Sequence, residues 1–285
     1  MNAQEVELAQ DREFEFTDTD FARIRTYVKE NTGINLSEAK KNMVYSRLSR
    51  RLRQLDTRSF AEYWERVIAP DSDEKGSFIN AITTNLTAFF RENHHFEFLR
   101  DVLLPELVKQ NQRTRRLRIW SAGCSTGEEP YSIAMTILEN VPDASHWDIK
   151  ILATDLDTNV LAHATAGVYD LERINGISDA RKRRWFQRGQ GKHSGSVRVA
   201  KTLRDIVNFR QLNLMGKWPM SGKFDFMFCR NVIIYFDKPT QKVLFDRYAE
   251  LLADNAHIFL GHSETLYSIT DRYELLGKTI YKKLR

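Results

Sequence analysis

The sequence predicts an α/β protein in which a small all-α domain precedes a parallel β-sheet. The first 80 residues carry only helical apolar patterns, whereas strand-like and helical patterns alternate after residue 90. A third observation is an interruption at 167–213, where glycines and short alternating stretches predict an inserted antiparallel β-subdomain. We therefore expect an N-terminal helical domain over 1–80, a linker over 81–92 and a sheet domain over 93–285.

Four helices are expected in the N-terminal domain. The first begins at the capping-box pattern Thr17–Asp20 and ends at Gly33. Ser37 is the expected cap of the second helix, whose apolar face lies opposite basic residues. The third stops at Pro70, and a short fourth helix is expected over 74–84. Four such helices predict a compact bundle.

The second domain is expected to begin with a helix over 96–110, kinked or restarted at Pro105. Strands are predicted over 117–120, 149–153, 224–228 and 257–260, and helices over 130–140, 158–166 and 239–253. Two short strands are expected over 273–284. This alternation is typical of a parallel sheet covered by helices.

Composition narrows the class of protein. The chain has 285 residues, 42% of them hydrophobic, and no apolar run approaching the roughly 20 residues that span a bilayer. Its polar, acidic start is unlike a secretory signal, and its two cysteines lack metal-ligand spacing. The net charge of +5 is mild for a nucleic-acid binder. We expect a cytoplasmic, monomeric protein that neither binds nucleic acid nor inserts into a membrane.

The segment 117–130 is the most informative, because a strand breaks into a small-residue loop before a helix. Such a loop presents backbone amides and carboxylates to a ligand at the end of a parallel strand. Asp155 ends the next strand, where a carboxylate can accept hydrogen bonds from both ribose hydroxyls. The pyrophosphate-binding pattern G-x-G-x-x-G is absent, which favours a nucleoside ligand without phosphates, such as S-adenosylmethionine.

The same segment also fits the hydrolase pattern G-x-S-x-G with Ser125 as nucleophile. Asp225 or Asp237 with His262 would complete a triad in the expected chain order. A nucleophilic serine in this pattern should lead almost directly into the helix, whereas four residues separate Ser125 from Pro130. In addition, no oxyanion segment of the His-Gly-Gly-Gly type is present. This alternative also leaves Asp155 without a role.

Three further features point to function. The strand over 224–228 runs into Arg230 and Asn231, polar groups placed where an adenine or methionyl group would sit, although a capping asparagine would give the same pattern. Arg91 lies at the domain junction, where it can fold over a ligand and hold a carboxylate. His94 and His95 are interpreted as ordinary helix-start residues, not metal ligands. The basic face of the second helix favours an acidic partner.

Together these segments resemble the bacterial chemotaxis receptor methyltransferases of the CheR type. The resemblance runs from the second helix to Gly261-His262-Ser263-Glu264, and its most specific motifs are 85–91, 125–132 and 228–236. It implies a class I S-adenosylmethionine-dependent methyltransferase sheet, Rossmann-like, with an inserted antiparallel β-subdomain and a preceding helical domain. It implies methyl transfer to glutamate side chains of chemoreceptors in chemotaxis adaptation, with S-adenosylhomocysteine as the product.

Site residues follow from the resemblance, motif by motif. The implied cofactor contacts are Asn85, Thr87, Arg91, Glu129, Asp155, Asn213, Leu214, Arg230 and Asn231. The implied receptor contacts are Arg47, Arg50, Arg51 and Arg53 on the basic helix, with Gly189 and Gly191 for a receptor C-terminal peptide in some members. Glycine is usual in relatives where this chain has Asp254-Asn255-Ala256, which concerns a turn.

Direct displacement is the expected mechanism. A glutamate with a pKa near about 4.3 is already ionised at neutral pH, so the reaction needs no general base. Arg91 and Tyr235 are the candidates for orienting the reacting groups. Reversing the charge of Arg50 and Arg51 should weaken receptor methylation and leave cofactor binding intact. The other alternative is a catalytically inactive module that only tethers the receptor, although the cofactor motifs are intact.

Overall fold

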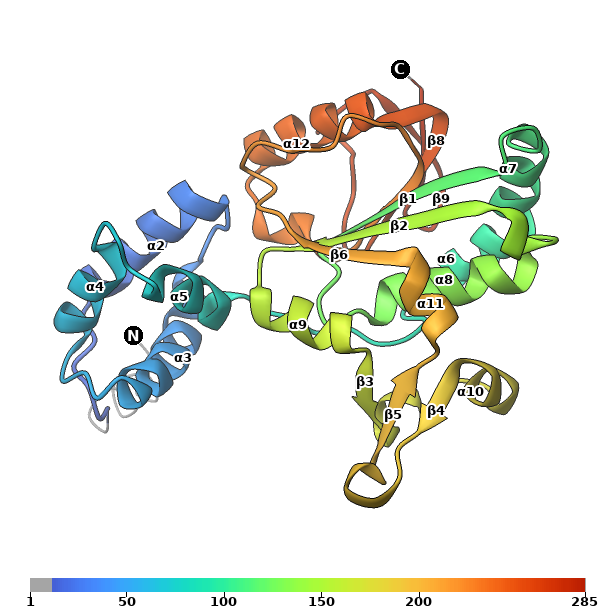
Figure 1. Ribbon diagram of the computed structural model, residues 1–285. Coiled ribbons are helices and arrows are strands. Elements are labelled where there is room, and N and C mark those ends of the chain that lie inside the picture. The colour runs from blue at the N-terminus through green and yellow to red at the C-terminus, as the bar shows by residue number, and fades with distance from the viewer. Residues whose placement is uncertain (1–11, 285) are drawn as a thin grey trace. The chain divides into compact units, whose positions relative to one another are not determined.

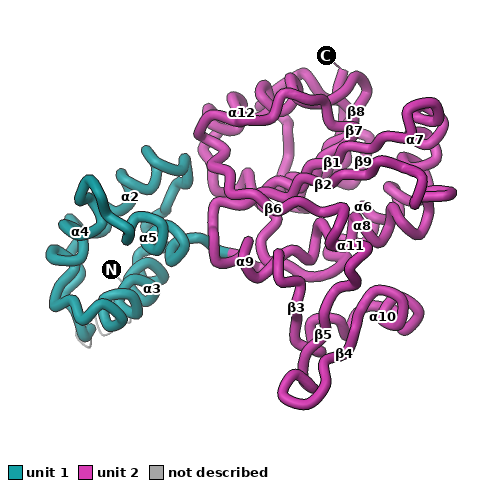
Figure 2. Tube along the Cα trace, viewed as in Figure 1, with its two compact units in different colours: residues 1–84 teal, residues 85–285 magenta. Residues whose placement is uncertain are grey.

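The computed structural model describes residues 12–284 and divides into two compact units. One unit ends at Thr84 and the other begins at Asn85 (Figure 2). Each unit has its own hydrophobic core. Among the described residues, no helix is long and apolar enough to cross a bilayer.

The first unit is a bundle of short helices. These are α2 (Asp18–Thr32), α3 (Lys41–Gln54), α4 (Phe60–Ile68) and α5 (Glu74–Ile82). The capping box at Thr17 and the left-handed Gly33 that ends α2 are confirmed. Ser37 makes no capping hydrogen bond, and a 3-10 turn over Glu38–Lys40 separates it from α3, so the prediction of Ser37 as a cap is wrong.

The second unit is built on a mixed seven-stranded sheet with the order β6-β2-β1-β7-β8-β10-β9 (Figure 1). The strands are β1 (Arg116–Ala122), β2 (Asp148–Asp155), β6 (Val207–Gln211), β7 (Phe224–Cys229), β8 (Leu252–Leu260), β9 (Tyr273–Gly277) and β10 (Ile280–Lys283). The first five are parallel, and β10 runs antiparallel to β8 and β9.

The strand order reverses direction between β1 and β7. The chain proceeds from β1 outward to β2 and β6, and then returns to pair β7 with β1 on its other side. In open parallel sheets, ligands bind in the crevice beyond the carboxyl ends of the strands at this reversal. The topology therefore points to the loops that follow β1, β2 and β7.

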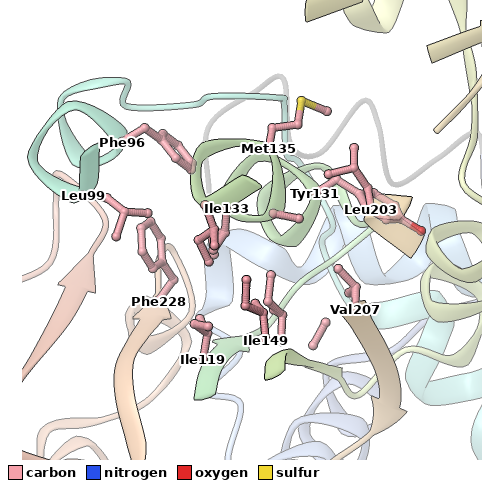
Figure 3. Packing of buried hydrophobic residues seen from close by; sticks show 14 of the residues in the cluster. Phe96, Leu99, Ile119, Tyr131, Ile133, Met135, Ile149, Leu203, Val207 and Phe228 are labelled. Carbon is pink, nitrogen blue, oxygen red and sulfur yellow. The ribbon is translucent and has the colours of Figure 1, made fainter. Parts of the chain in front are cut away.

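Helices cover both faces of the sheet (Figure 1). They are α6 (His94–Phe98), α7 (Leu104–Gln110), α8 (Glu128–Asn140), α9 (Thr158–Ala166), α11 (Lys201–Ile206) and α12 (Lys238–Leu251). Figure 3 shows Ile133 of α8 with Ile119 of β1, Phe228 of β7 and Phe96 of α6 in the main cluster. Because α8 is buried along most of its length, its first turn is held firmly against the sheet.

The inserted β-subdomain is shorter than the range 167–213 predicted from the sequence. Its sheet has the order β3-β5-β4, formed by β3 (Val168–Asp170), β4 (Phe186–Arg188) and β5 (Ser196–Val199), with α10 (Asp179–Trp185) between β3 and β4. The backbone N–H of Val199 donates to the carbonyl of Gly167 at 2.8 Å, so the two ends of this sheet meet. Placing Val207 and Phe209 in the insert was wrong, because β6 pairs in parallel with β2 in the main sheet.

Other boundaries of helices, strands and the linker also differ from those predicted from the sequence. The helix predicted over 96–110 is α6 and α7 joined by a π-helical turn at Leu99–Leu103. Pro105 lies in the first turn of α7, where its missing N–H disrupts little, so the irregularity precedes the proline. Strand β8 begins at Leu252, earlier than predicted, and residues 85–92, expected as a linker, belong to the second unit.

Candidate functional site

The loop between β1 and α8 is packed against neighbouring segments by its two glycines. Gly123 has φ +75°, and a Cβ there would lie 2.3 Å from Cγ2 of Val232, which follows β7. Gly127 has φ +96°, and its Cβ would lie 2.8 Å from Cβ of Ala164 in α9. Side chains at either position would force the segments apart, so Gly123 lets the loop approach the end of β7 and Gly127 lets it approach α9.

Glu129 lies in the first turn of α8 and is buried. Its Oε1 accepts a hydrogen bond from Ser121 Oγ at 2.7 Å, and its Oε2 lies 3.3 Å from Nη1 of Arg230. Burial raises the pKa of Glu129, while Arg230 and Ser121 favour its charged form. The helix N-terminus adds to that stabilisation.

Arg230 joins three segments at the end of β7. Besides Glu129, its Nη2 donates to the carbonyl of Arg91 and lies 3.4 Å from Glu92 Oε2. Its side chain is only 2% exposed, and no hydrogen-bond partner within the described chain satisfies its Nε. A buried guanidinium with an unused donor is expected where a ligand completes the network.

Asp155 ends β2 and is 9% exposed. Its Oδ2 accepts from the backbone N–H of Ser125 at 2.8 Å, and its Oδ1 from that of Asp157 at 3.0 Å. Burial raises the pKa of Asp155, and these amide hydrogen bonds oppose the shift. The backbone N–H of Leu156 also favours the charged form, and the acceptor capacity that remains on the carboxylate fits a hydroxyl donor.

Hydrogen bonds hold the segment 85–91 against the loop between β1 and α8 and the segments beside it. Asn85 Nδ2 donates to Asp157 Oδ2 at 2.7 Å, and its carbonyl accepts from Ser125 Oγ at 2.9 Å. The carbonyl of Thr87 accepts from Arg173 at 3.0 Å, and Arg91 Nη1 donates to the carbonyl of Leu86 at 2.8 Å. Asn85 and Arg91 are thereby brought to the loops that carry Asp155 and Arg230.

The remaining predicted residues lie on the loops that follow β6 and β7. The N–H of Leu212 donates to the carbonyl of Asp155 at 2.9 Å, which places Asn213 and the buried Leu214 beyond β2. Asn213 Oδ1 accepts from the N–H of Met215 at 2.9 Å. Tyr235 is partly buried in the 3-10 turn Ile233–Tyr235.

Sequence reasoning assigned no role to Glu264, which is 4% exposed. Its Oε2 accepts from the N–H groups of Gly261 at 2.6 Å and Asn231 at 2.8 Å, and its Oε1 from that of Ile234 at 3.3 Å. Asn231 has φ +59°, a conformation that asparagine tolerates better than most residues. Glu264 therefore fixes the loop that presents Arg230, Asn231 and Tyr235.

A second missed group lies at the start of α8. Glu128 is completely buried, accepts from Thr126 Oγ1 at 2.6 Å and pairs with Arg173 of the insert. Arg173 also donates to the carbonyl of Thr87. The adjacent acidic pair Glu128-Glu129 was visible in the sequence, but only the fold shows that the two carboxylates face different partners.

The predicted receptor contacts fall into different structural situations. On α3, Arg47 donates to the carbonyl of Ile82 at 2.9 Å, Arg51 pairs with the buried Glu74, and Arg53 lies 2.8 Å from Glu13. Arg50 is exposed, and no contact of its guanidinium is found among residues 12–284. In the β-subdomain, a Cβ at Gly189 would lie 2.0 Å from the carbonyl oxygen of His193, so this turn requires glycine.

Comparison with known proteins adds to this geometry. The sequence model of the CheR methyltransferase SAM-binding domain matches residues 85–282, and that of the CheR methyltransferase all-alpha domain matches 19–83. The chain belongs to the CheR methyltransferase family. It is therefore an S-adenosylmethionine-dependent methyltransferase with the predicted fold.

Among individual relatives, chemotaxis protein methyltransferase 2 of Pseudomonas aeruginosa is 48% identical over 271 residues, covering 95% of each chain. A probable chemotaxis protein methyltransferase of Rhizobium etli is 43% identical and covers 88% of this chain and 95% of its own. The chemotaxis protein methyltransferase of Escherichia coli is 42% identical, over 93% of this chain and 91% of its own.

The hydrolase alternative is wrong for this CheR chain. Ser125 Oγ donates to a carbonyl, and His262 Nδ1 lies 3.2 Å from Glu92 Oε1. Asp225 accepts from Asn111 and from the N–H of Arg118, and Asp237 caps α12. These contacts pair neither Ser125 with His262 nor His262 with either aspartate. Ser125 instead fixes the loop between β1 and α8 through its contacts with Asn85 and Asp155.

Proposed function

We propose that this methyltransferase acts on glutamate side chains of chemoreceptors, using the loops beyond β1, β2 and β7 as its cofactor site. The buried carboxylate of Asp155, held by backbone amides at the end of β2 with acceptor capacity remaining, carries this proposal. It suits the ribose diol of S-adenosylmethionine. Glu129 and Arg230 supply opposite charges for the ammonium and carboxylate of the methionine part.

The reaction follows from the charges of its partners. S-adenosylmethionine supplies an electrophilic methyl group on a sulfonium. The receptor glutamate is ionised at neutral pH, so its oxygen forms the new C–O bond as the C–S bond breaks, and no proton is transferred. The protein's contribution is positioning, worth about 7–11 kcal/mol in favourable intramolecular models. Arg91 and Tyr235 are the proposed orienting groups, with Asn85, Thr87, Asn213, Leu214 and Asn231 lining the cofactor.

Calorimetry with S-adenosylhomocysteine tests the cofactor site. Asp155→Asn keeps one carbonyl oxygen as an acceptor but places N–H groups against the amide of Ser125 or Asp157, so affinity should fall about tenfold or more. Asp179→Asn, on the exposed start of α10, is the matched control. Equal affinity in the wild type and Asp155→Asn would reject the assigned site.

Receptor recognition is proposed on α3 and on the turn between β4 and β5. Since Arg47 and Arg51 are engaged inside the first unit, the exposed charge of Arg50, supported by Arg53, is the part of the basic face available to acidic receptor helices. Gly189 and Gly191 shape a turn beside an edge strand, which suits an extended peptide.

Methyl transfer from radiolabelled S-adenosylmethionine to receptor cytoplasmic fragments, with and without their C-terminal tails, tests these roles. We expect base-labile methyl esters on glutamates. Loss of the tail should raise KM and leave kcat unchanged if the turn holds the tail. Label that resists base would contradict ester formation.

A further inference from the structure

A group of potential metal ligands lies where α6 begins, next to Arg230. Glu92, His94 and His95 each offer one ligand atom, and these atoms all lie within 4.8 Å of one another. Glu92 has φ +55°, a conformation uncommon outside glycine that turns its side chain toward the two imidazoles. The sequence pattern predicts that both histidines start a helix and are not metal ligands; they do start a helix, whereas their geometry departs from the second part of that prediction.

The protonation of His95 can be assigned from its partners. Its ring is fully buried, and Nε2 lies 3.0 Å from the carbonyl oxygen of Lys278. Because a carbonyl can only accept, Nε2 carries the hydrogen. In the tautomer that this contact selects, Nδ1 presents its lone pair on the opposite side of the ring.

That lone pair faces another acceptor. Nδ1 of His95 lies 3.7 Å from Oε2 of Glu92, and neither atom has a hydrogen-bond partner within the described chain. Two buried acceptors facing each other are unfavourable unless a donor or a cation lies between them. Arg230 does not fill this role for His95, because its guanidinium is directed to Glu129, Glu92 and the carbonyl of Arg91.

A fourth ligand is available from the loop after β8. His262 Nδ1 lies 3.2 Å from the other oxygen of Glu92, and its side chain is 71% exposed. The rings of His94 and His95 have their centroids 4.2 Å apart. Three imidazoles and one carboxylate form a nitrogen-rich set that suits zinc and related transition metals better than magnesium or calcium.

We propose that Glu92, His94 and His95, with His262 as a further ligand, bind one transition-metal dication of the zinc type. In a tetrahedral zinc site with bonds of about 2.0 Å, ligand atoms lie about 3.3 Å apart, so the separation of 3.7 Å between His95 and Glu92 needs only a small closure. The hydrogen bond from His95 Nε2 to Lys278 is the outer contact that commonly orients a metal-bound imidazole. Glu129 compensates the charge of Arg230, which limits repulsion of the metal.

The test uses the full chain without a histidine tag, titrated with Zn²⁺ by calorimetry and with Co²⁺ as a spectroscopic probe. We expect one equivalent of Zn²⁺ to bind, Co²⁺ to give the intense visible absorption of a tetrahedral complex, and Zn²⁺ to raise the melting temperature. His94→Ala and His262→Ala change side chains that are not fully buried, so both should fold, and each should weaken Zn²⁺ binding about tenfold or more. Glu92→Gln should also weaken it.

His146→Ala is the matched control, because His146 is exposed in the 3-10 turn Ala144–His146 and should not affect binding. A wild type that binds no Zn²⁺ below millimolar concentration would overturn the proposal and assign the gap to a bridging water. Binding that persists unchanged in His94→Ala and Glu92→Gln would also overturn it, since the metal would then lie elsewhere.

Discussion

Arg51 in the first unit and Arg230 in the second each hold carboxylates in a buried network, and the two networks differ in how completely their polar atoms are satisfied. In the first unit, Arg51 Nε and Nη2 donate to the two oxygens of Glu74 at 2.6 and 2.7 Å, and the hydroxyl of Tyr63 donates to Oε1 at 2.8 Å. In the second, Arg230 Nε and Glu92 Oε2 have no hydrogen-bond partner among the described residues, although Arg230 Nη2 lies 3.4 Å from Glu92 Oε2. A closed network fixes a fold, whereas an open one at the end of a parallel strand is available to ligands.

Breaking the closed network should have the largest effect on stability. Glu74→Ala leaves Arg51 and Tyr63 without their common acceptor, so the first unit should lose about 3–5 kcal/mol of unfolding free energy. Hydrogen exchange of the amides of α3 and α5 measures this loss. Glu65→Ala, exposed on α4, is the control. A loss below about 1 kcal/mol would show that the network is not structural.

Changes to the Arg230 network in the second unit should alter ligand affinity. Arg230→Lys keeps the charge but cannot reach Glu129 and the carbonyl of Arg91 at once, so affinity for S-adenosylhomocysteine should fall about 10- to 100-fold. Arg51→Lys, the corresponding change in the first unit, should lower stability and leave this affinity unchanged. Calorimetry and thermal unfolding of both variants give the comparison. Equal effects of the two variants on affinity would remove the distinction between the networks.

Glu264 should show an intermediate effect, because it acts on the site through the backbone. In Glu264→Gln, the amide nitrogen cannot accept from Ile234 or from Asn231 and Gly261, so stability should fall by about 1–3 kcal/mol. The loosened loop should raise KM for the cofactor as well. Glu274→Gln, on the exposed edge strand β9, is the control. Unchanged KM despite lower stability would make Glu264 purely structural.

A buried histidine outside both networks provides a smaller, pH-dependent effect. Burial lowers the pKa of His257 to about 4, below its value of about 6.5 in an unfolded chain. Its contribution to stability is therefore complete above pH 6.5 and is lost as the pH falls toward 4, by up to about 3 kcal/mol. His257→Leu should flatten the stability–pH profile in this range, and His146→Leu should not. Parallel profiles for wild type and His257→Leu would contradict the assignment.

The smallest effect on stability is expected at Arg50. Arg50→Glu changes an exposed side chain, so unfolding should shift by about 0.5 kcal/mol or less. Receptor methylation should nevertheless fall several-fold at low salt, and the difference from wild type should shrink as salt rises. Arg113→Glu, exposed in the second unit, controls for net charge. The double variant that includes Arg51 is less informative, because Arg51 holds Glu74.

The sequence predicted the fold well where the pattern was local. The capping box at Thr17, the strands that end near Asp155 and Arg230, and the helix that starts after Gly127 all follow from short-range patterns. The same patterns misassigned Val207, because alternation does not say which sheet a strand joins. The roles of Glu264 and Glu92 could not be found this way, since Asn231 and Ile234 lie 33 and 30 residues from Glu264, and His262 lies 170 residues from Glu92.

The hydrogen bond from Val199 to Gly167 bears on which parts of this protein can change in sequence. A backbone hydrogen bond joins the two ends of the β-subdomain, so the subdomain is an insertion in the crossover connection from β2 to β6. It is joined to the rest of the unit by polar contacts, among them Tyr169 on Thr126, Trp185 on Glu139 and Arg173 on Glu128, and by buried apolar residues that belong to the main core. Deleting the whole subdomain would expose that core and leave the buried Glu128 without its arginine. Recognition carried by the exposed turn over 190–195 can instead change while the strands of the main sheet keep their register.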